Sequence, residues 1–102
     1  MTAAATDNAD KKSNFSNYGT WVDVSAPGEA VLTTANGGDY VTSSGTSFSS
    51  PIVAGLAGLI LTSHPDWTPA MVRAQLTHTV DAIDAGNPTY AGKLGAGRVN
   101  AT

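Results

Sequence analysis

Residues 48–63 constrain the fold of this chain more than any other segment. A helix over these residues would have no polar side before its end. Ala and Gly fill the spaces between six large aliphatic residues, which are Ile52, Val53, Leu56, Leu59, Ile60 and Leu61. Because a helix that is apolar all round has to be covered all round, we predict a buried central helix here. Its small residues allow neighbouring backbones to approach closely.

A second helix is predicted after a break in the pattern. Thr68 is a typical N-cap, and Pro69 suits the first helical position, where its missing N–H does least harm. Val72, Leu76 and Val80 recur every four residues, so this helix has one buried stripe and is amphipathic.

Strands are predicted before the central helix. Residues 21–26 alternate apolar and polar and stop at a Pro-Gly pair, which is typical of a strand ended by a turn. Residues 30–34 and 40–43 flank the sequence NGGD, and this pattern predicts a β-hairpin because Asn and Gly tolerate positive φ. Residues 2–18 are expected to form a surface loop after a short strand end. These elements predict an α/β fold with a few, partly parallel strands.

Composition limits the classes of protein to consider. A length of 102 residues allows one domain with a modest core, and a charged fraction of only 13% favours a globular state. The net charge of −3 comes without a basic patch, so no nucleic-acid partner is expected. Without cysteine, the chain has neither a disulfide nor a thiolate metal site.

Neither a signal peptide nor a membrane partner is expected. The N-terminus has no basic start and no apolar run, which a signal peptide requires. The longest apolar stretch, residues 52–61, is too short to span a bilayer.

The heptapeptide GTSFSSP at residues 45–51 stands between the predicted hairpin and the central helix. Ser47 would lie in the first helical turn, where backbone N–H groups are free and the dipole end is positive. There it can attack a carbonyl while its own N–H holds the developing oxyanion. Gly45 lets a substrate backbone pass close by. The plainer interpretation is that this Ser/Thr cluster only caps the helix.

Four blocks together carry a family resemblance. They are SNFSNYG at residues 13–19, WVDVSAPG at 21–28, SGTSFSSPIVAG at 44–55 and GRVNA at 97–101. In order and spacing they resemble the C-terminal part of the catalytic domain of subtilisin-like serine peptidases (subtilases), most closely the thermitase-like branch. The resemblance implies that residues 1–102 are a single partial domain, the C-terminal portion of a three-layer α/β fold. It also implies an extracellular protein.

The resemblance implies roles for three adjacent residues. Ser47 matches the nucleophile of a serine endopeptidase, and its N–H matches one donor of the oxyanion hole. Gly45 and Thr46 match the wall of the pocket for the substrate residue before the scissile bond. Phe48 departs from the family, which usually has Met after the nucleophile, and we expect it to reshape the leaving-group side.

Calcium is the one cofactor that the resemblance allows. Asp23 resembles a position that helps to bind a weakly held cation in some members, but its partner ligands would lie upstream of this chain. We therefore expect Asp23 to be a solvent-facing strand residue, and we expect no resident metal.

The subtilase triad runs in the order Asp, His, Ser, and its Asp and His would lie upstream of this chain. His64 follows Ser47 on the same predicted helix at about 25 Å, far outside hydrogen-bond reach. If the second helix runs antiparallel to the first, His78 still lies about 10 Å short of Ser47. We therefore expect the isolated chain to cleave its peptide or protein substrate weakly or not at all.

Two alternatives remain open. The chain could be a non-catalytic module that binds or self-associates, because a sheet cut from a larger sheet exposes edges and leaves the central helix without cover. A partner could instead supply His and Asp in trans. The expected partners are a second copy of the chain or the upstream portion of the domain.

Overall fold

The computed structural model describes residues 1–34 and 37–101. Within them the chain forms α1 (Thr46–Ser63), α2 (Pro69–His78) and the short 3-10 helices η1 (Asp84–Gly86) and η2 (Pro88–Tyr90). The strands are β1 (Ala3–Thr6), β2 (Val24–Pro27), β3 (Val31–Thr34), β4 (Tyr40–Ser43), β5 (Val80–Asp81) and β6 (Arg98–Val99).

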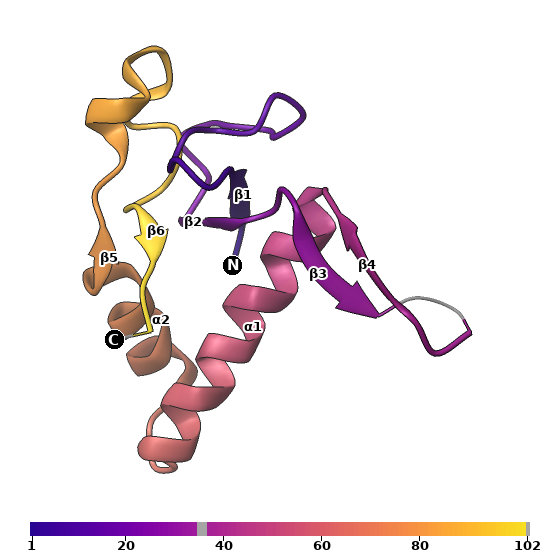
Figure 1. The fold of residues 1–102 in the computed structure, drawn as a ribbon. Helices are drawn as coiled ribbons and strands as arrows, with labels where there is room; N and C mark the ends of the chain where they lie inside the picture. Colours follow the sequence, from indigo (N-terminus) through magenta and orange to yellow (C-terminus); the bar gives the residue numbers. More distant parts are fainter. Residues whose placement is uncertain (35–36, 102) are drawn as a thin grey trace.

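The strands form two sheets (Figure 1). In the larger sheet the order is β1-β2-β6-β5, with β1, β2 and β6 parallel and β5 antiparallel to β6. β3 and β4 form the predicted hairpin, which projects away from the rest of the chain in Figure 1. Gly37 and Gly38 in its turn have positive φ, whereas Asn36 lies outside the described residues. The predicted α/β fold with partly parallel strands is confirmed.

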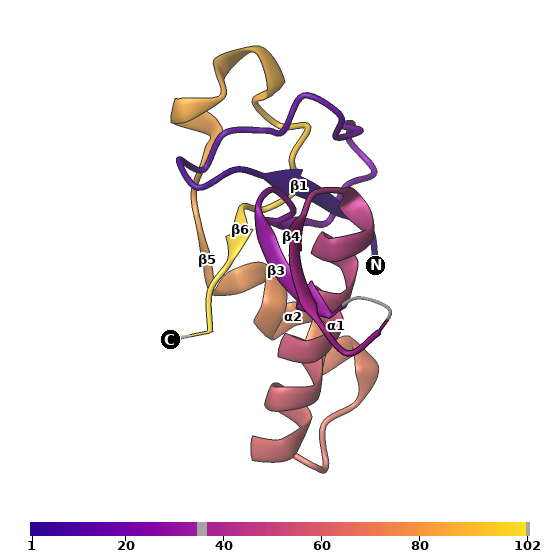
Figure 2. The same cartoon turned by 45° about the vertical axis from the view of Figure 1, so that its right-hand side comes forward.

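Both helices lie where the sequence predicts them. α1 begins two residues earlier than expected, at Thr46, and ends at Ser63. α2 begins at Pro69, and the Thr68 hydroxyl accepts a hydrogen bond from the Met71 N–H at 3.3 Å. Val72 and Leu76 are buried as predicted, but Val80 belongs to β5 rather than to the helix. Figures 1 and 2 show α2 beside the C-terminal half of α1.

The strand predicted over residues 21–26 starts later, at Val24. Val24, Ser25 and Ala26 are all buried, because β2 lies between two parallel neighbours and both faces of the sheet are covered. Buried and exposed residues therefore do not alternate along β2. Trp21, which the pattern placed in the strand, precedes it and is 64% exposed.

The expectation of a surface loop over residues 2–18 is wrong for residues 3–6. They form β1, and Ala4, Ala5 and Thr6 are buried. The following loop folds back over this strand: the Ala5 N–H donates to Ser16 Oγ at 2.9 Å, and the Ala5 carbonyl accepts from the Ser13 N–H at 3.0 Å. The sequence gives no strand pattern here, because the alanines of β1 are small and the serines that cover them are polar.

The prediction that the central helix is buried all round is also wrong. In α1 only Ser49 and Val53 are fully buried, and Leu59 is 63% exposed. The sheet covers one side of α1 and α2 another, and no further layer covers it in the described part of the chain. By length and composition alone α1 could cross a membrane, a property that core helices of soluble proteins share.

Two hydrophobic clusters cover the two faces of the larger sheet. The first joins the sheet to α1 and α2 through Val24, Ala26, Val53, Val72, Leu76 and Val99. The second lies under the loops and 3-10 helices on the opposite face and contains Ala4, Val22, Ile83 and Leu94. The chain thus buries one face of the sheet beneath helices and the other beneath irregular structure.

Replacing Leu94 by Ala tests the second cluster. Leu94 has no exposed surface, so Leu94→Ala should lower the free energy of unfolding by about 2–5 kcal/mol. Leu32→Ala is the matched control, because Leu32 is 70% exposed, and it should change stability by about 0.5 kcal/mol or less. Urea denaturation followed by circular dichroism measures both, and equal effects would contradict this packing.

Candidate active site

Ser47 lies in the first turn of α1. The N-cap is Gly45, and no side chain caps this helix start in the described part of the chain. Gly45 has a φ of 154°, a conformation that other residues rarely adopt. The interpretation of the Ser/Thr cluster as a side-chain cap is therefore wrong. Ser47 itself is exposed, so its hydroxyl is open to an incoming molecule.

Two contacts tie this helix start to the end of β2. The Gly45 N–H donates to the Gly28 carbonyl at 2.7 Å. The hydroxyl of the fully buried Ser49 donates to the carbonyls of Ala26 and Pro27, at 2.9 and 3.1 Å. The first turn of α1 is thus anchored at the carboxyl end of a parallel strand, where open α/β sheets commonly bind ligands.

Gly28 allows this close approach. A Cβ at Gly28 would lie 2.5 Å from Ser49 Oγ, 2.7 Å from Ala5 Cβ and 2.9 Å from the Gly45 carbonyl oxygen. No real Cβ contact is that short, so only glycine fits between β1 and the helix start. Ser49 and Gly28 position the turn that carries Ser47, although neither was among the residues predicted for the site. Gly28 and Ser49 both stand in the blocks quoted above that carry the family resemblance, and those blocks were the signal for them.

The other predicted site residues gather at the same turn. Thr46 is the first residue of α1 and is half-buried beside Gly45. Phe48 is half-buried, and its ring carbons lie 3.6 and 3.7 Å from where a Cβ of Gly45 would stand. Its N–H donates to the Gly45 carbonyl at 3.1 Å. The Phe48 ring therefore packs against the N-cap residue Gly45.

The exposed backbone of this turn can stabilise negative charge. The N–H groups of the first helical turn have no carbonyl four residues earlier to bind, and they carry the positive end of the helix dipole. The Ser47 N–H is one of these groups. An oxyanion that forms next to the Ser47 hydroxyl would therefore meet a fixed donor.

Comparison with known proteins accounts for this arrangement. The model of the subtilase family matches residues 1–97. The chain belongs to the subtilase family. It is 41% identical over 93 residues to Subtilisin NAT of Bacillus subtilis subsp. natto, covering 91% of this chain and 24% of that protein. It is 43% identical over 101 residues to Thermitase of Thermoactinomyces vulgaris, covering 99% of this chain and 34% of that protein.

Solved structures agree with the sequence relatives. A protease from Pseudoalteromonas arctica PAMC 21717 superimposes with a TM-score of 0.86 at 34% identity, covering 97% of this chain and 33% of that chain. The present chain thus spans about a quarter to a third of the length of the subtilases that it matches.

Neither histidine of this subtilase chain comes near Ser47. His64 follows the last residue of α1, about 25 Å along the helix, and its ring stacks on Trp67 at 3.9 Å with an interplanar angle of 8°. His78 is exposed in the last turn of α2, and α2 lies beside the C-terminal half of α1, whereas Ser47 lies in the first turn of α1. A general base has to lie within direct or one-water reach, and the structure places neither His64 nor His78 there.

The expectation that Asp23 is a solvent-facing strand residue is wrong. Its carboxylate accepts a hydrogen bond from the Thr2 N–H at 2.7 Å and forms an ion pair with Arg73, so its side chain is only 19% exposed. The residues that the structure describes contain no group of three or more His, Cys, Asp or Glu side chains that could hold a metal ion. Both carboxylate oxygens of Asp23 thus have partners within the chain.

Removing the Ser49 hydroxyl tests the anchor of the helix start. Ser49→Ala leaves two strand carbonyls without this donor and should lower the free energy of unfolding by about 1–3 kcal/mol. Ser50→Ala is the matched control, because Ser50 is exposed. This substitution should change the free energy of unfolding by about 0.5 kcal/mol or less. Denaturation midpoints measure the difference, and a Ser49→Ala protein as stable as the control would refute the anchor.

Proposed function

We propose that this chain is the serine-bearing portion of a subtilase catalytic domain and that Ser47 is the nucleophile in peptide-bond hydrolysis. The observation that carries the proposal is the exposed Ser47 in an uncapped helix turn anchored to the end of β2. Family membership supports the same reaction class. In this proposal residues 1–102 form one partial domain.

Each residue of the turn has a step in this reaction. The Ser47 Oγ attacks the scissile carbonyl carbon while its proton passes to a histidine from outside this chain. The Ser47 N–H donates to the oxyanion that forms. The C–N bond then breaks, the amine leaves with that proton, and water hydrolyses the ester on Ser47. Gly45 and Thr46 line the pocket for the substrate residue before the scissile bond.

The rest of the machinery comes from outside the chain in this proposal. An Asp and a His complete the triad, and a second donor completes the oxyanion hole. We propose an extracellular location, as the family resemblance implies. No metal takes part in any of these steps.

The isolated chain should show almost no activity that depends on Ser47. In subtilisin, loss of the triad serine or histidine lowers kcat by about a million-fold, and the same order is expected without a base. Hydrolysis of casein and of a chromogenic peptide is compared for the wild type, Ser47→Ala and the exposed-site control Ser50→Ala. Turnover at ordinary enzyme rates that only Ser47→Ala abolishes would support Ser47 as the nucleophile but contradict the proposal that its base comes from outside the chain.

A second candidate function is a non-catalytic, self-associating module. The exposed apolar surface of α1 favours it, because Leu59 and Leu61 are 63% and 41% exposed. If this function is correct, the mass of the purified chain in light scattering should rise with concentration across the micromolar range. A constant monomer mass would count against it.

A further inference from the structure

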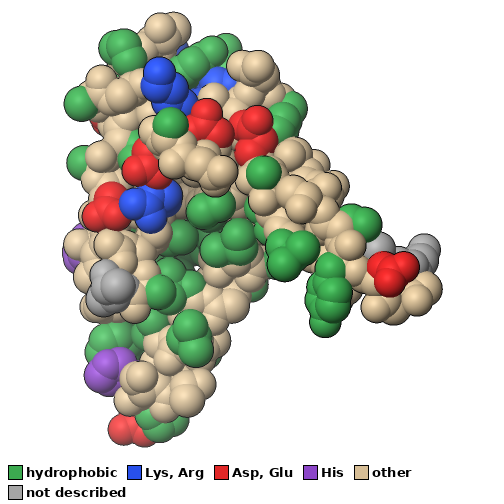
Figure 3. Space-filling model, viewed as in Figure 1, with side chains coloured by type: hydrophobic (Ala, Val, Ile, Leu, Met, Phe, Trp, Pro, Cys, Tyr) green, Lys and Arg blue, Asp and Glu red, His purple; other side chains and the backbone are tan. Residues whose placement is uncertain are grey.

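The hairpin of β3 and β4 is a small sheet with two open edges. β3 and β4 pair only with each other, in an unbroken antiparallel register of four residue pairs. The outward N–H and C=O groups of both strands therefore have no strand partner in the described part of the chain. Figure 3 shows hydrophobic side chains, in green, on the surface of this projecting arm. An edge of this kind can bind a further strand.

Neither strand carries a feature that blocks such pairing. β3 has the sequence VLTT and β4 the sequence YVTS, so both lack charged residues and proline. Their register contains no bulge. Natural edge strands are commonly protected by charges, proline or bulges, because an unprotected edge pairs with other chains. Val, Tyr and Thr also favour strands, so the hairpin is composed to pair rather than to repel.

The edge of β4 is more accessible than the edge of β3. Tyr40, Val41 and Thr42 are all exposed, Tyr40 by 71% and Val41 by 45%. Since successive side chains of a strand point to opposite faces, both faces beside β4 are open. In β3, half-buried and exposed residues alternate, so one of its faces is partly covered. A further strand therefore meets fewer obstacles at β4.

We propose that the edge of β4 binds the same edge of a second copy of this chain. Two identical edges pair antiparallel about a two-fold axis perpendicular to the sheet. Because that axis keeps each face on its own side, a residue can lie opposite only a residue whose side chain points the same way. The register that buries most apolar surface places Val41 opposite the partner's Val41 and Tyr40 opposite the partner's Thr42. The product is a four-stranded sheet in the order β3-β4-β4-β3.

Side chains and charges agree with this register. The pair of Tyr40 and Thr42 joins an aromatic to a β-branched side chain, a combination that stabilises antiparallel sheets. Asp39 is the charged residue next to β4 in the sequence. The two copies of Asp39 lie four positions apart along the strands, about 13 Å. At physiological ionic strength the Debye length is about 8 Å, so their repulsion is largely screened.

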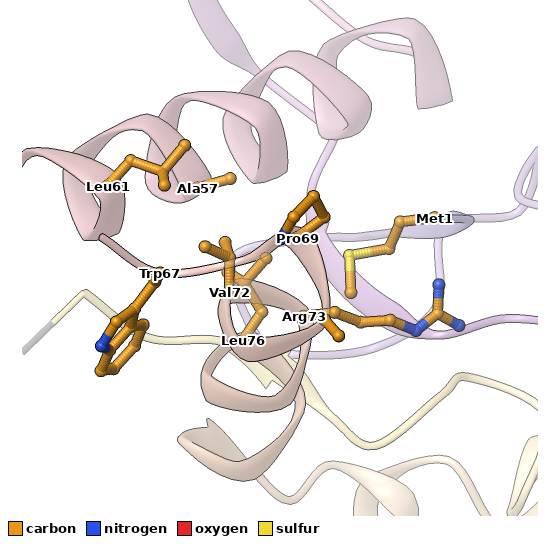
Figure 4. A pocket seen from close by; sticks show the side chains of 9 residues that line it. Met1, Ala57, Leu61, Trp67, Pro69, Val72, Arg73 and Leu76 are labelled. Atoms are coloured by element: carbon orange, nitrogen blue, oxygen red, sulfur yellow. The ribbon is translucent and has the colours of Figure 1, made fainter. Parts of the chain in front are cut away.

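The groove between α1 and α2 suits a second copy less well. It is apolar, its volume is about 580 Å³, and Figure 4 shows Ala57 and Leu61 of α1 and Val72 and Leu76 of α2 lining it. About a two-fold axis a second copy presents the same groove, and two hollows do not fill each other. A strand edge, in contrast, is complementary to itself.

The expected dimer is weak. A short ladder centred on Val41 buries less than the roughly 1,000 Å² that a stable interface needs, so we expect a Kd on the order of 100 µM. The pairing requires only the hairpin. It is therefore independent of the peptidase role proposed for Ser47.

Sedimentation equilibrium of the full chain tests this pairing, from about tenfold below to about tenfold above that Kd. The wild type should change from monomer to dimer over this range. Val41→Lys and Val41→Glu each place two like charges opposite each other, and each should weaken dimerisation at least about tenfold. An equimolar mixture of the two variants should dimerise at least as well as the wild type, because opposite charges then face each other.

Matched controls locate the effect at the edge of β4. Thr34→Lys and Thr34→Glu make the same charge changes at an exposed residue of the outer strand β3, and both should leave dimerisation unchanged. Leu59→Lys changes an exposed residue of α1 and should also leave it unchanged. Circular dichroism verifies that every variant is folded.

The outcomes decide the inference separately from the peptidase role. A dimer that both Val41 variants lose and their mixture regains supports the pairing. A folded wild type that stays monomeric over the whole range overturns it, as does a dimer that Leu59→Lys dissociates and Val41→Lys does not. A mixture that stays monomeric also overturns it, because residue 41 then does not face its own copy. Hydrolysis that depends on Ser47 is a different measurement, and its absence leaves this inference intact.

Discussion

The contact between the start of α1 and the end of β2 determines where the chemistry of this subtilase chain can occur. The Ser49 hydroxyl bonds two strand carbonyls, and the Gly45 N–H bonds a third, on Gly28. These bonds join the hairpin, the sheet and the helix at one point. Because the helix starts there without a side-chain cap, its first amides remain available, and Ser47 stands beside them.

The same anchor explains the close packing around the turn. β1 approaches the helix start through Ala5, and only a glycine at position 28 leaves room for it. The Phe48 ring packs against Gly45 at the N-cap. The site is therefore held from several directions, although the chain has only a modest core. One helix turn can supply both a nucleophile and one oxyanion donor. A base and the carboxylate that orients it have to come from other segments.

Burial was harder to anticipate than secondary structure. The apolar pattern of residues 48–63 predicted α1 correctly, but the helix is covered by the sheet on one side and α2 on another and is open elsewhere. The alanines of β1 gave no strand signal, yet they are buried because a serine-rich loop folds over them. Asp23 likewise looked exposed from its strand pattern, and an arginine fifty residues later covers it.

By itself the sequence determined the positions of both helices and the hairpin, the placement of Ser47 at a helix start and the subtilase family. These depend on local backbone preferences, on periodicity and on blocks of neighbouring residues. Only the tertiary structure decided that Gly45 rather than a Ser or Thr side chain begins α1, that Ser49 anchors it, and that an apolar face stays open beside it. Such features depend on contacts between segments far apart in the chain, which no local pattern records.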